Sequence, residues 1–346
     1  MLDFIRLTRP LNLLIMAATM LLMRYGLLEG QLERGLHELL QEPGIDVSRA
    51  DLILDPRFGP QLPLPLFVLL VLSTVLIAAG GNIINDYFDT RIDRINKPEE
   101  VIVGRTVKRR VAMMGHLLFS GLGFLLGTVV AWRTGLWHLI VIPAFAVMAL
   151  WMYSMSLKRQ LIIGNGTVAL LTALVPLIVG LYEIPLMQRA LMDAPLTVTV
   201  PGEFEEVTYS MSLPYTELWW WVLGFSAFAF IASLVRELQK DMADVKGDEA
   251  LGCRTIPIVW GMKSARVLTL VYIGALVIAL LALRMFVLHD TLSFWYIGVG
   301  IIGPLLLSAG FTYNAVERKE HLRAGNLMKV AMVMGVTFAA LIRYLP

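Results

Sequence analysis

Apolar stretches of about 20 residues recur along the whole chain, separated by shorter polar segments. A helical stretch of this length crosses the hydrocarbon core of a bilayer. The pattern predicts nine spanning helices, at roughly 11–28, 63–84, 111–131, 136–155, 162–182, 218–235, 267–288, 292–312 and 326–344. We therefore expect an all-α integral membrane protein built as a nine-transmembrane-helix bundle.

Two longer polar insertions interrupt this pattern, at about 29–62 and about 185–216. Both are rich in proline and acidic residues, which leaves open whether they form ordered caps or flexible loops. We interpret residues 1–346 as one transmembrane domain that carries both insertions. The first apolar stretch is too long for the core of a signal peptide and has no clear cleavage site, so we expect it to remain as the first helix.

The composition agrees with a membrane protein. The 346 residues are 57% hydrophobic and 16% charged, whereas soluble domains carry about 25% charged residues. The mean hydropathy is +0.71. A single cysteine, Cys253, excludes an intrachain disulfide and a cysteine-based metal site. No basic run is long enough to indicate nucleic acid, and no protein partner is evident, so the expected surroundings are the lipid bilayer.

The distribution of basic residues predicts how the helices are oriented. If the N-terminus is inside and the spans alternate, most of the 29 Lys and Arg residues lie in inside segments. This bias is typical of cytoplasmic loops. It predicts the plasma (inner) membrane, with the N-terminus inside, the C-terminus outside and both polar insertions outside.

Two acidic clusters, at 85–93 and 241–248, each lie at the end of an apolar span. Carboxylates are expensive to place there, so they usually mark a site. Residues four apart share one face of a helix. Groups at that spacing are Asn85, Asp89 and Asp93, then Asn82 with Asp86, Glu237 with Asp241, and Asp244 with Asp248.

Two facing strips of oxygen ligands are suited to Mg²⁺, which usually takes one or two carboxylates and completes its shell with water and phosphate. The sequence thus predicts a diphosphate held through Mg²⁺ at a membrane surface. The alternative is a solvated charged loop, with the carboxylates paired to nearby arginines and lysines. Ca²⁺ binding is a weaker option, because no EF-hand spacing is present.

The paired motifs resemble those of the UbiA superfamily of intramembrane prenyltransferases. The family's first motif, Asn-Asp-x-x-Asp-x-x-x-Asp, is matched within 85–93, and its second Asp-rich motif within 236–248. The opening Arg-Pro-x-Asn is similar to Arg9-Pro10-Leu11-Asn12. The resemblance extends from about residue 6 to the C-terminus, apart from the insertions. It implies a nine-helix bundle with a central cavity, capped by two cytoplasmic loops that carry the aspartates, and prenyl transfer from a prenyl diphosphate.

The resemblance and the expected chemistry assign candidate roles. Expected Mg²⁺ ligands are Asp89, Asp93, Asp244 and Asp248 first, then Asn85, Asp86 and Asp241. Expected phosphate contacts are Arg105, Lys158 and Arg9, for which simple anchoring by positive charge is the alternative. With the four leading aspartates, Lys158 and Arg105 form the expected catalytic set, and the expected substrate-binding set is Arg9, Asn12, Asn82, Asn85, Tyr153 and Lys240.

Aromatic faces near the motifs could stabilise an allylic cation. Tyr87, Phe88 and Tyr153 are placed to do so, although ordinary helix packing is the more common role of such residues. No general base is evident.

The run at 81–98 most resembles the branch of the family that alkylates geranylgeranylglyceryl phosphate, which implies a geranylgeranyl donor and an ether lipid product. An aromatic quinone precursor is the alternative acceptor. Outside the enzyme class, a transporter or a lipid-binding protein is the alternative. Transporters more often carry their acids at mid-span, whereas here the acids lie at span ends.

Overall fold

The computed structural model describes residues 2–39, 59–193, 197–200, 207–210 and 215–344. Within these ranges it contains nine helices long and apolar enough to cross a membrane, as the hydropathy pattern predicts. The first half comprises α1 (Leu2–Leu7), α2 (Pro10–Leu21), the π-helical η1 (Leu22–Leu28), α3 (Glu29–Leu39), α5 (Leu64–Asn96), η3 (Pro98–Glu100), α6 (Arg109–Arg133), η4 (Trp137–Ile140), α7 (Val141–Met155) and η5 (Leu157–Arg159).

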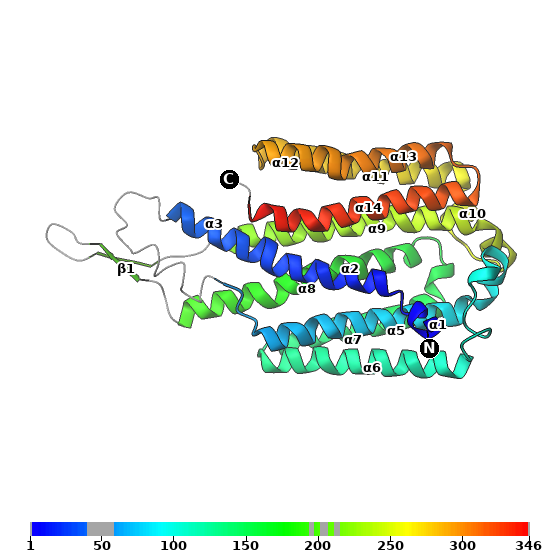
Figure 1. Ribbon diagram of the computed structural model, residues 1–346, viewed down its shortest axis with the longest axis horizontal. Helices are drawn as coiled ribbons and strands as arrows, with labels where there is room; N and C mark the ends of the chain where they lie inside the picture. Colours follow the sequence, from blue (N-terminus) through cyan, green and yellow to red (C-terminus); the bar gives the residue numbers. More distant parts are fainter. Residues whose placement is uncertain (1, 40–58, 194–196, 201–206, 211–214, 345–346) are drawn as a thin grey trace.

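The second half is also helical apart from one hairpin. It comprises α8 (Ile163–Asp193), β1 (Thr197–Val200), β2 (Val207–Ser210), α9 (Tyr215–Ala250), α10 (Ile256–Val259), α11 (Met262–Phe286), α12 (Thr291–Trp295), the π-helical η6 (Tyr296–Ile302), α13 (Gly303–Asn314) and α14 (Arg318–Ile342). The long helices run side by side along one direction, and the two chain ends lie at opposite ends of the bundle (Figure 1).

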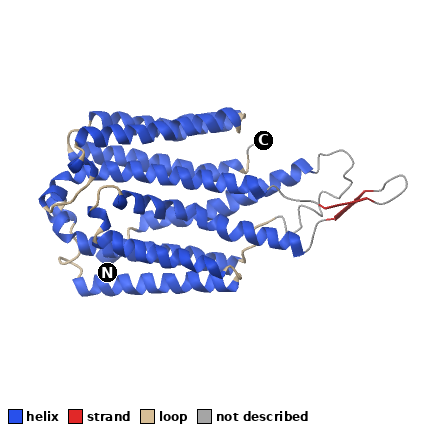
Figure 2. Ribbon diagram, turned by 180° about the vertical axis from the view of Figure 1, so that it is seen from behind, coloured by secondary structure: helices blue, strands red, loops and turns tan. Residues whose placement is uncertain are grey.

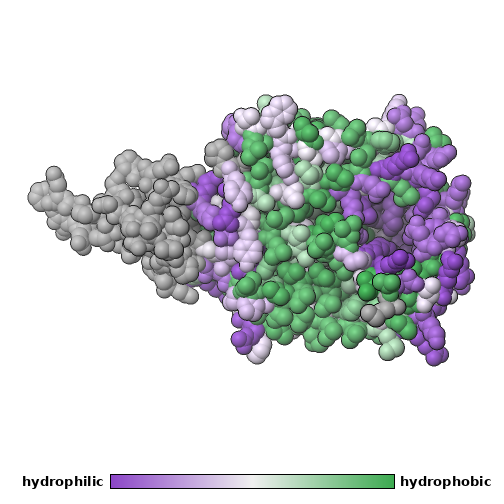
Figure 3. Space-filling view, in the orientation of Figure 1, coloured by the Kyte–Doolittle hydropathy of each residue, from purple (hydrophilic) through white to green (hydrophobic). Residues whose placement is uncertain are grey.

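The hydrophobic surface of the bundle fits a bilayer. Hydrophobic side chains cover its middle, while hydrophilic side chains gather most densely at the end where α5 and α9 finish (Figure 3). We call this the motif end, defined by Asn96 of α5 and Ala250 of α9. The prediction of an integral membrane protein is confirmed.

The insertions begin as helices. α3 continues the first span, and α8 continues through Pro185 to Asp193, so helix extends into both predicted insertions. β1 and β2 pair antiparallel, with Thr197 opposite Ser210, beyond the end of the bundle opposite the motif end (Figure 2). Much of the first insertion, 40–58, lies outside the described residues.

Helices α5 and α6 pack closely because small residues line their contact. The Ser73 hydroxyl donates a hydrogen bond to the Gly123 carbonyl oxygen at 2.7 Å. A Cβ on Gly123 would lie 2.7 Å from the Ile77 side chain, so only glycine permits this approach. Small residues at helix contacts are how membrane helices gain packing energy where lipid tails give no hydrophobic driving force.

A buried ion pair joins two helices at the end of the bundle opposite the motif end. The Arg24 guanidinium of η1 lies 3.0 Å from the Glu183 carboxylate of α8, and both side chains are nearly inaccessible. The second carboxylate oxygen of Glu183 accepts hydrogen bonds from the backbone N–H groups of Gln61 and Leu62, at 2.9 and 3.0 Å. One acid therefore joins the first span, the fifth span and the segment that enters α5.

Candidate active site

Both aspartate motifs lie on helices. The resemblance implied that capping loops carry them, and this expectation is wrong. α5 stays helical to Asn96 and α9 stays helical to Ala250, several turns beyond their apolar segments. The i, i+4 spacing therefore holds across both motifs, and each presents a continuous strip of oxygen atoms.

Asn96 joins the two motif helices directly. Its side-chain amide donates to the carbonyl oxygen of Asp244 at 3.1 Å and accepts from the N–H of Gly247 at 2.9 Å. A Cβ on Gly247 would lie 2.5 Å from the Asn96 side chain, so only a glycine allows this contact. The end of α5 is thereby held against the second motif.

Each carboxylate of the first motif is paired with a cation. Asp86 lies 2.6 Å from Arg9, and Asp93 lies 3.5 Å from Lys97. Asp89 accepts a short hydrogen bond from the Lys158 ammonium of η5. The same ammonium lies 3.4 Å from Asn85 Oδ1.

The second motif is partnered less completely. Asp241 accepts from the Asn165 amide at 2.8 Å, and Asp244 lies 3.3 Å from Arg318. Asp248 is buried, and its carboxylate makes no hydrogen bond or ion pair with the described residues. Two helices that bring their carboxylates together, with one acid that has no partner among the described residues, are an arrangement that a divalent cation would stabilise.

In the part of the chain that the structure describes, no three His, Cys, Asp or Glu side chains converge on one metal position. The oxygen donors are instead divided between two helices. This division fits Mg²⁺, because Mg²⁺ needs few protein ligands when phosphate and water complete its coordination. The donors that could hold it are Asn85, Asp86, Asp89, Asp93, Asp241, Asp244 and Asp248.

Two cations beside the motifs have shifted pKa values. Burial lowers the pKa of the Lys158 ammonium, and the adjacent Asp89 carboxylate offsets part of this shift. Burial also lowers the pKa of Arg9, but its pairing with Asp86 more than compensates, and the net shift is upward. Arg9 is also the one described non-glycine residue with positive φ, at 55°. Such backbone conformations cost about 1–3 kcal/mol and concentrate at functional sites.

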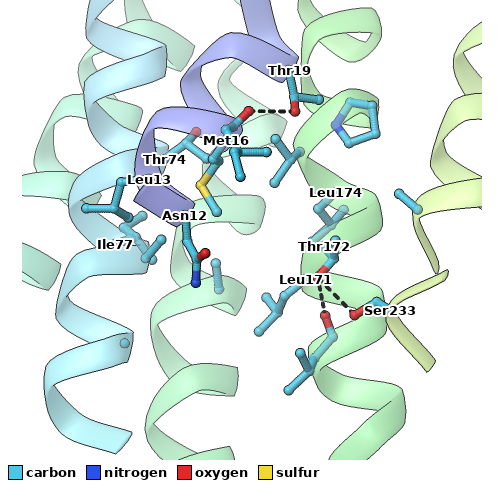
Figure 4. Close-up of a pocket in the computed structure, with 18 of the residues that line it drawn as sticks. Asn12, Leu13, Met16, Thr19, Thr74, Ile77, Leu171, Thr172, Leu174 and Ser233 are labelled. Atoms are coloured by element: carbon cyan, nitrogen blue, oxygen red, sulfur yellow. Dashed lines mark hydrogen bonds between the residues drawn. The ribbon is translucent and has the colours of Figure 1, made fainter. Parts of the chain in front are cut away.

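A cavity of about 380 Å³ extends from the motifs into the bundle. Its walls are mainly apolar and come from α2, α5, α7, α8, α9 and α14. Asn12 and Met16 of α2 and Ile77 of α5 face Leu171 of α8 across it (Figure 4). An apolar wall of this kind suits a prenyl chain and limits the access of water to a reacting carbon.

All six residues of the predicted substrate-binding set line this cavity, at its polar end. They are Arg9, Asn12, Asn82, Asn85, Tyr153 and Lys240. These residues come from α2, α5, α7 and α9. The Asn82 side chain is held in place because its amide donates a hydrogen bond to the Thr8 carbonyl oxygen at 2.9 Å.

Other predicted residues lie elsewhere. Arg105 is exposed on the loop after η3, and its side chain makes no hydrogen bond or ion pair with the described residues and does not line the cavity. Tyr87 packs against the Arg109 guanidinium, 4.2 Å from its ring centre, and Phe88 packs edge-on against Trp151. Neither Tyr87 nor Phe88 lines the cavity, which fits the packing alternative for both.

Several residues that contribute to the site escaped sequence reasoning. Lys329 and Arg236 line the cavity. Arg318 pairs with Asp244, and Asn96 joins the motif helices. The sequence contains one signal for these residues: Lys329 is a charged residue within an apolar span, and such residues usually mark a functional site. The excess of basic residues on the inner side offers a simpler explanation for Lys329 and hides this signal.

A family model described as the UbiA prenyltransferase family matches residues 57–340 of this chain. The chain belongs to the UbiA prenyltransferase family. The prediction of a prenyltransferase is therefore confirmed.

Individual relatives agree with the family match. The chain is 31% identical to a digeranylgeranylglyceryl phosphate synthase from Thermococcus kodakarensis over 294 residues, which are 82% of this chain and 88% of that protein. It is 31% identical to a protein of the same name from Methanothermobacter thermautotrophicus, over 79% of this chain and 84% of that protein.

Solved structures show the same fold at low sequence identity. A structure of a digeranylgeranylglyceryl phosphate synthase matches with a TM-score of 0.56 at 17% identity, covering 98% of each chain. A UbiA homolog from Archaeoglobus fulgidus, bound to GPP and Mg²⁺, matches with a TM-score of 0.55 at 14% identity, covering 98% of this chain and 99% of that one. The predicted nine-helix membrane fold is thus confirmed.

Proposed function

We propose that this protein transfers a geranylgeranyl group from its diphosphate to geranylgeranylglyceryl phosphate. In this reaction the bond between the allylic carbon and the diphosphate oxygen breaks, an ether C–O bond forms, and the acceptor hydroxyl loses its proton. The observation that carries the proposal is the meeting of two oxygen-donor strips, on α5 and α9, at the polar end of an apolar cavity. The names of the similar archaeal proteins support this choice of acceptor.

We assign Mg²⁺ to the two strips, with Asp89, Asp93, Asp244 and Asp248 as leading ligands. Bound Mg²⁺ would supply a Lewis acid that stabilises negative charge on the departing diphosphate. The residue chemistry fits, because every donor is a hard oxygen and the carboxylate of Asp248 has no hydrogen-bond or ion-pair partner in the part of the chain that the structure describes.

Lys158 and Arg9 have the position and charge to contact the diphosphate. Each is paired with a motif carboxylate, Asp89 or Asp86. When metal neutralises these carboxylates, both cations can turn to phosphate oxygens without leaving the site. Charges positioned before the reaction stabilise developing negative charge with little reorganisation.

The remaining assignments concern topology. We propose a single prenyltransferase domain in the plasma membrane, with the motif end facing the cytoplasm, the N-terminus inside and the C-terminus outside. The excess of basic residues in the segments at the motif end supports this orientation. The insertions then lie on the outer side.

The test is diphosphate release by the purified full-length protein in detergent, with geranylgeranyl diphosphate and Mg²⁺. Geranylgeranylglyceryl phosphate and 4-hydroxybenzoate are supplied in separate reactions. We expect release only with the lipid acceptor and only with Mg²⁺. Asp89→Ala and Asp244→Ala should each reduce the rate at least about 100-fold.

Glu100→Gln is the matched control, because Glu100 is an exposed acid at the same end of the bundle and its carboxylate makes no hydrogen bond or ion pair with the described residues. Its rate should equal that of the wild type. Release with 4-hydroxybenzoate alone would replace the lipid acceptor by an aromatic one. No release with either acceptor would contradict the proposed reaction.

A further inference from the structure

Lys329 is a cation placed well inside a membrane span. It lies eleven residues beyond Arg318, the first residue of α14, which corresponds to about 16 Å along the helix. Its side chain lines the cavity, and its ammonium donates a hydrogen bond to Asn12 Oδ1 at 2.7 Å. No carboxylate among the described residues pairs with it. Ionisable residues in spans are costly and usually serve a function.

Arg236 of α9 lines the same cavity as Lys329. Its carboxylate partner is Glu237, at 3.3 Å, and Lys240 shares that carboxylate at 3.7 Å. Arg9, the fourth cation of the cavity, is paired with Asp86. The cavity therefore holds more positive than negative charge.

This positive charge lies deeper than the aspartates of α9. Arg236 precedes Asp241 by five residues and Asp244 by eight, which corresponds to about 7 and about 12 Å along the axis. A diphosphate held through the aspartates and Lys158 would leave Lys329 without a carboxylate partner among the described residues, while Arg236 and Lys240 would still share the single carboxylate of Glu237. Two cations that line one largely apolar cavity are strongly stabilised by an anion between them.

We propose that Lys329, supported by Arg236 and Asn12, binds the phosphate of the acceptor lipid and so selects a phosphorylated acceptor. This inference rests on the proposed function and adds a second anion site, separate from the site of the donor diphosphate. A glyceryl phosphate carries its phosphate only a few bonds from its free hydroxyl. A phosphate bound at Lys329 therefore leaves that hydroxyl near the metal-bound donor.

The test compares Lys329→Met, Lys329→Arg and Lys319→Met in the full-length protein. Lys319 lies on the same helix, is exposed, and its ammonium makes no hydrogen bond or ion pair with the described residues, so Lys319→Met removes an equal charge outside the cavity. Steady-state kinetics are measured with geranylgeranylglyceryl phosphate and with geranylgeranylglycerol, which lacks the phosphate. Thermal stabilisation by each acceptor alone provides a readout that does not depend on turnover.

For Lys329→Met we expect KM for the phosphorylated acceptor to rise about tenfold or more, with KM for the donor within about twofold of wild type. Its KM for geranylgeranylglycerol should be unchanged, and Lys329→Arg should restore most of the affinity. Without ligand, Lys329→Met should melt at or above the wild-type temperature, because it removes an uncompensated charge from a span.

Other results would overturn the inference. A rise in KM for the donor would place Lys329 at the diphosphate site, and an equal loss with both acceptors would make its role one of packing. If wild type binds the phosphorylated acceptor without turnover, and Lys329→Met abolishes the stabilisation by that lipid, the proposed reaction fails but the phosphate site stands. If the phosphorylated lipid stabilises wild type no more than geranylgeranylglycerol does, the phosphate site fails.

Discussion

At the scale of single residues, the proposed site is a set of carboxylates, most of them paired with cations. Asp86, Asp89 and Asp93 each pair with a lysine or arginine, whereas the Asp248 carboxylate has no hydrogen-bond or ion-pair partner among the described residues. Pairing lowers the free-energy cost of placing these acids at the end of a membrane helix. It also keeps positive charges where we propose that the diphosphate binds.

Lys158→Met tests whether Lys158 leaves Asp89 for the diphosphate when metal binds. Without the ammonium, Asp89 loses its partner and becomes a freer metal ligand. Mn²⁺, used as a probe for Mg²⁺ in the absence of diphosphate, should therefore bind more tightly in titration calorimetry. Diphosphate release should nevertheless fall about 100-fold, because the departing group loses a preplaced cation.

Arg159→Met is the control, because Arg159 is the neighbouring cation, is exposed, and its guanidinium makes no hydrogen bond or ion pair with the described residues. It should change neither quantity. Mn²⁺ affinity that drops in Lys158→Met would show that the lysine supports the metal site instead of competing for it.

At the scale of elements, the geometry of the site depends on how closely α5 and α9 approach. Asn96 bridges them, and Gly247 leaves the space for its amide. The motif helices extend beyond their apolar segments, so helix packing sets the spacing between the two oxygen strips.

Gly247→Ala should push the two motif helices apart. The added methyl group meets Asn96 at 2.5–2.7 Å, and overpacking of this kind costs about 1–3 kcal/mol. The melting temperature in detergent should fall, and diphosphate release should fall with it. Gly274→Ala in α11 is the matched control, because a Cβ there meets nothing within 4 Å.

The control should be neutral or slightly stabilising, because alanine is favoured over glycine in a helix by about 1 kcal/mol. Normal activity in Gly247→Ala would mean that the spacing of the two strips tolerates the shift.

At the scale of the whole molecule, the two ends of the bundle have different tasks. The motif end carries the chemistry, and the opposite end is fastened by the pair of Arg24 and Glu183. This pair joins the first and fifth spans to the entry of α5, the helix that carries the first motif. A mutation at the end opposite the motif end should therefore lower the stability of the fold without lowering the catalytic rate per folded molecule.

Glu183→Gln should destabilise the fold by about 3–5 kcal/mol, because it leaves the buried Arg24 charge without its counter-ion. Thermal unfolding in detergent measures this loss, while the rate per folded molecule should remain near that of the wild type. Glu217→Gln is the control, because Glu217 is an exposed acid at the same end and its carboxylate makes no hydrogen bond or ion pair with the described residues. It should change stability by less than about 0.5 kcal/mol. A specific rate that fell as far as stability would contradict this separation.

The sequence by itself determined the nine spans, the presence of both motifs at one end of the bundle and the family. Span length and hydropathy are local properties, and the spacing within a motif survives as long as its segment is helical. These features therefore follow from short windows of sequence, without knowledge of neighbouring helices.

Only the tertiary structure decided which side chains meet. It paired Lys329 with Asn12 and Lys158 with Asp89, and it left Arg105 on an exposed loop. It also placed Asn96 against Gly247. These contacts join residues far apart in the chain, and they depend on the rotation and depth at which each helix packs. Hydropathy records whether a segment enters the membrane, but the shapes of the facing helix surfaces decide which of its sides turns toward the cavity.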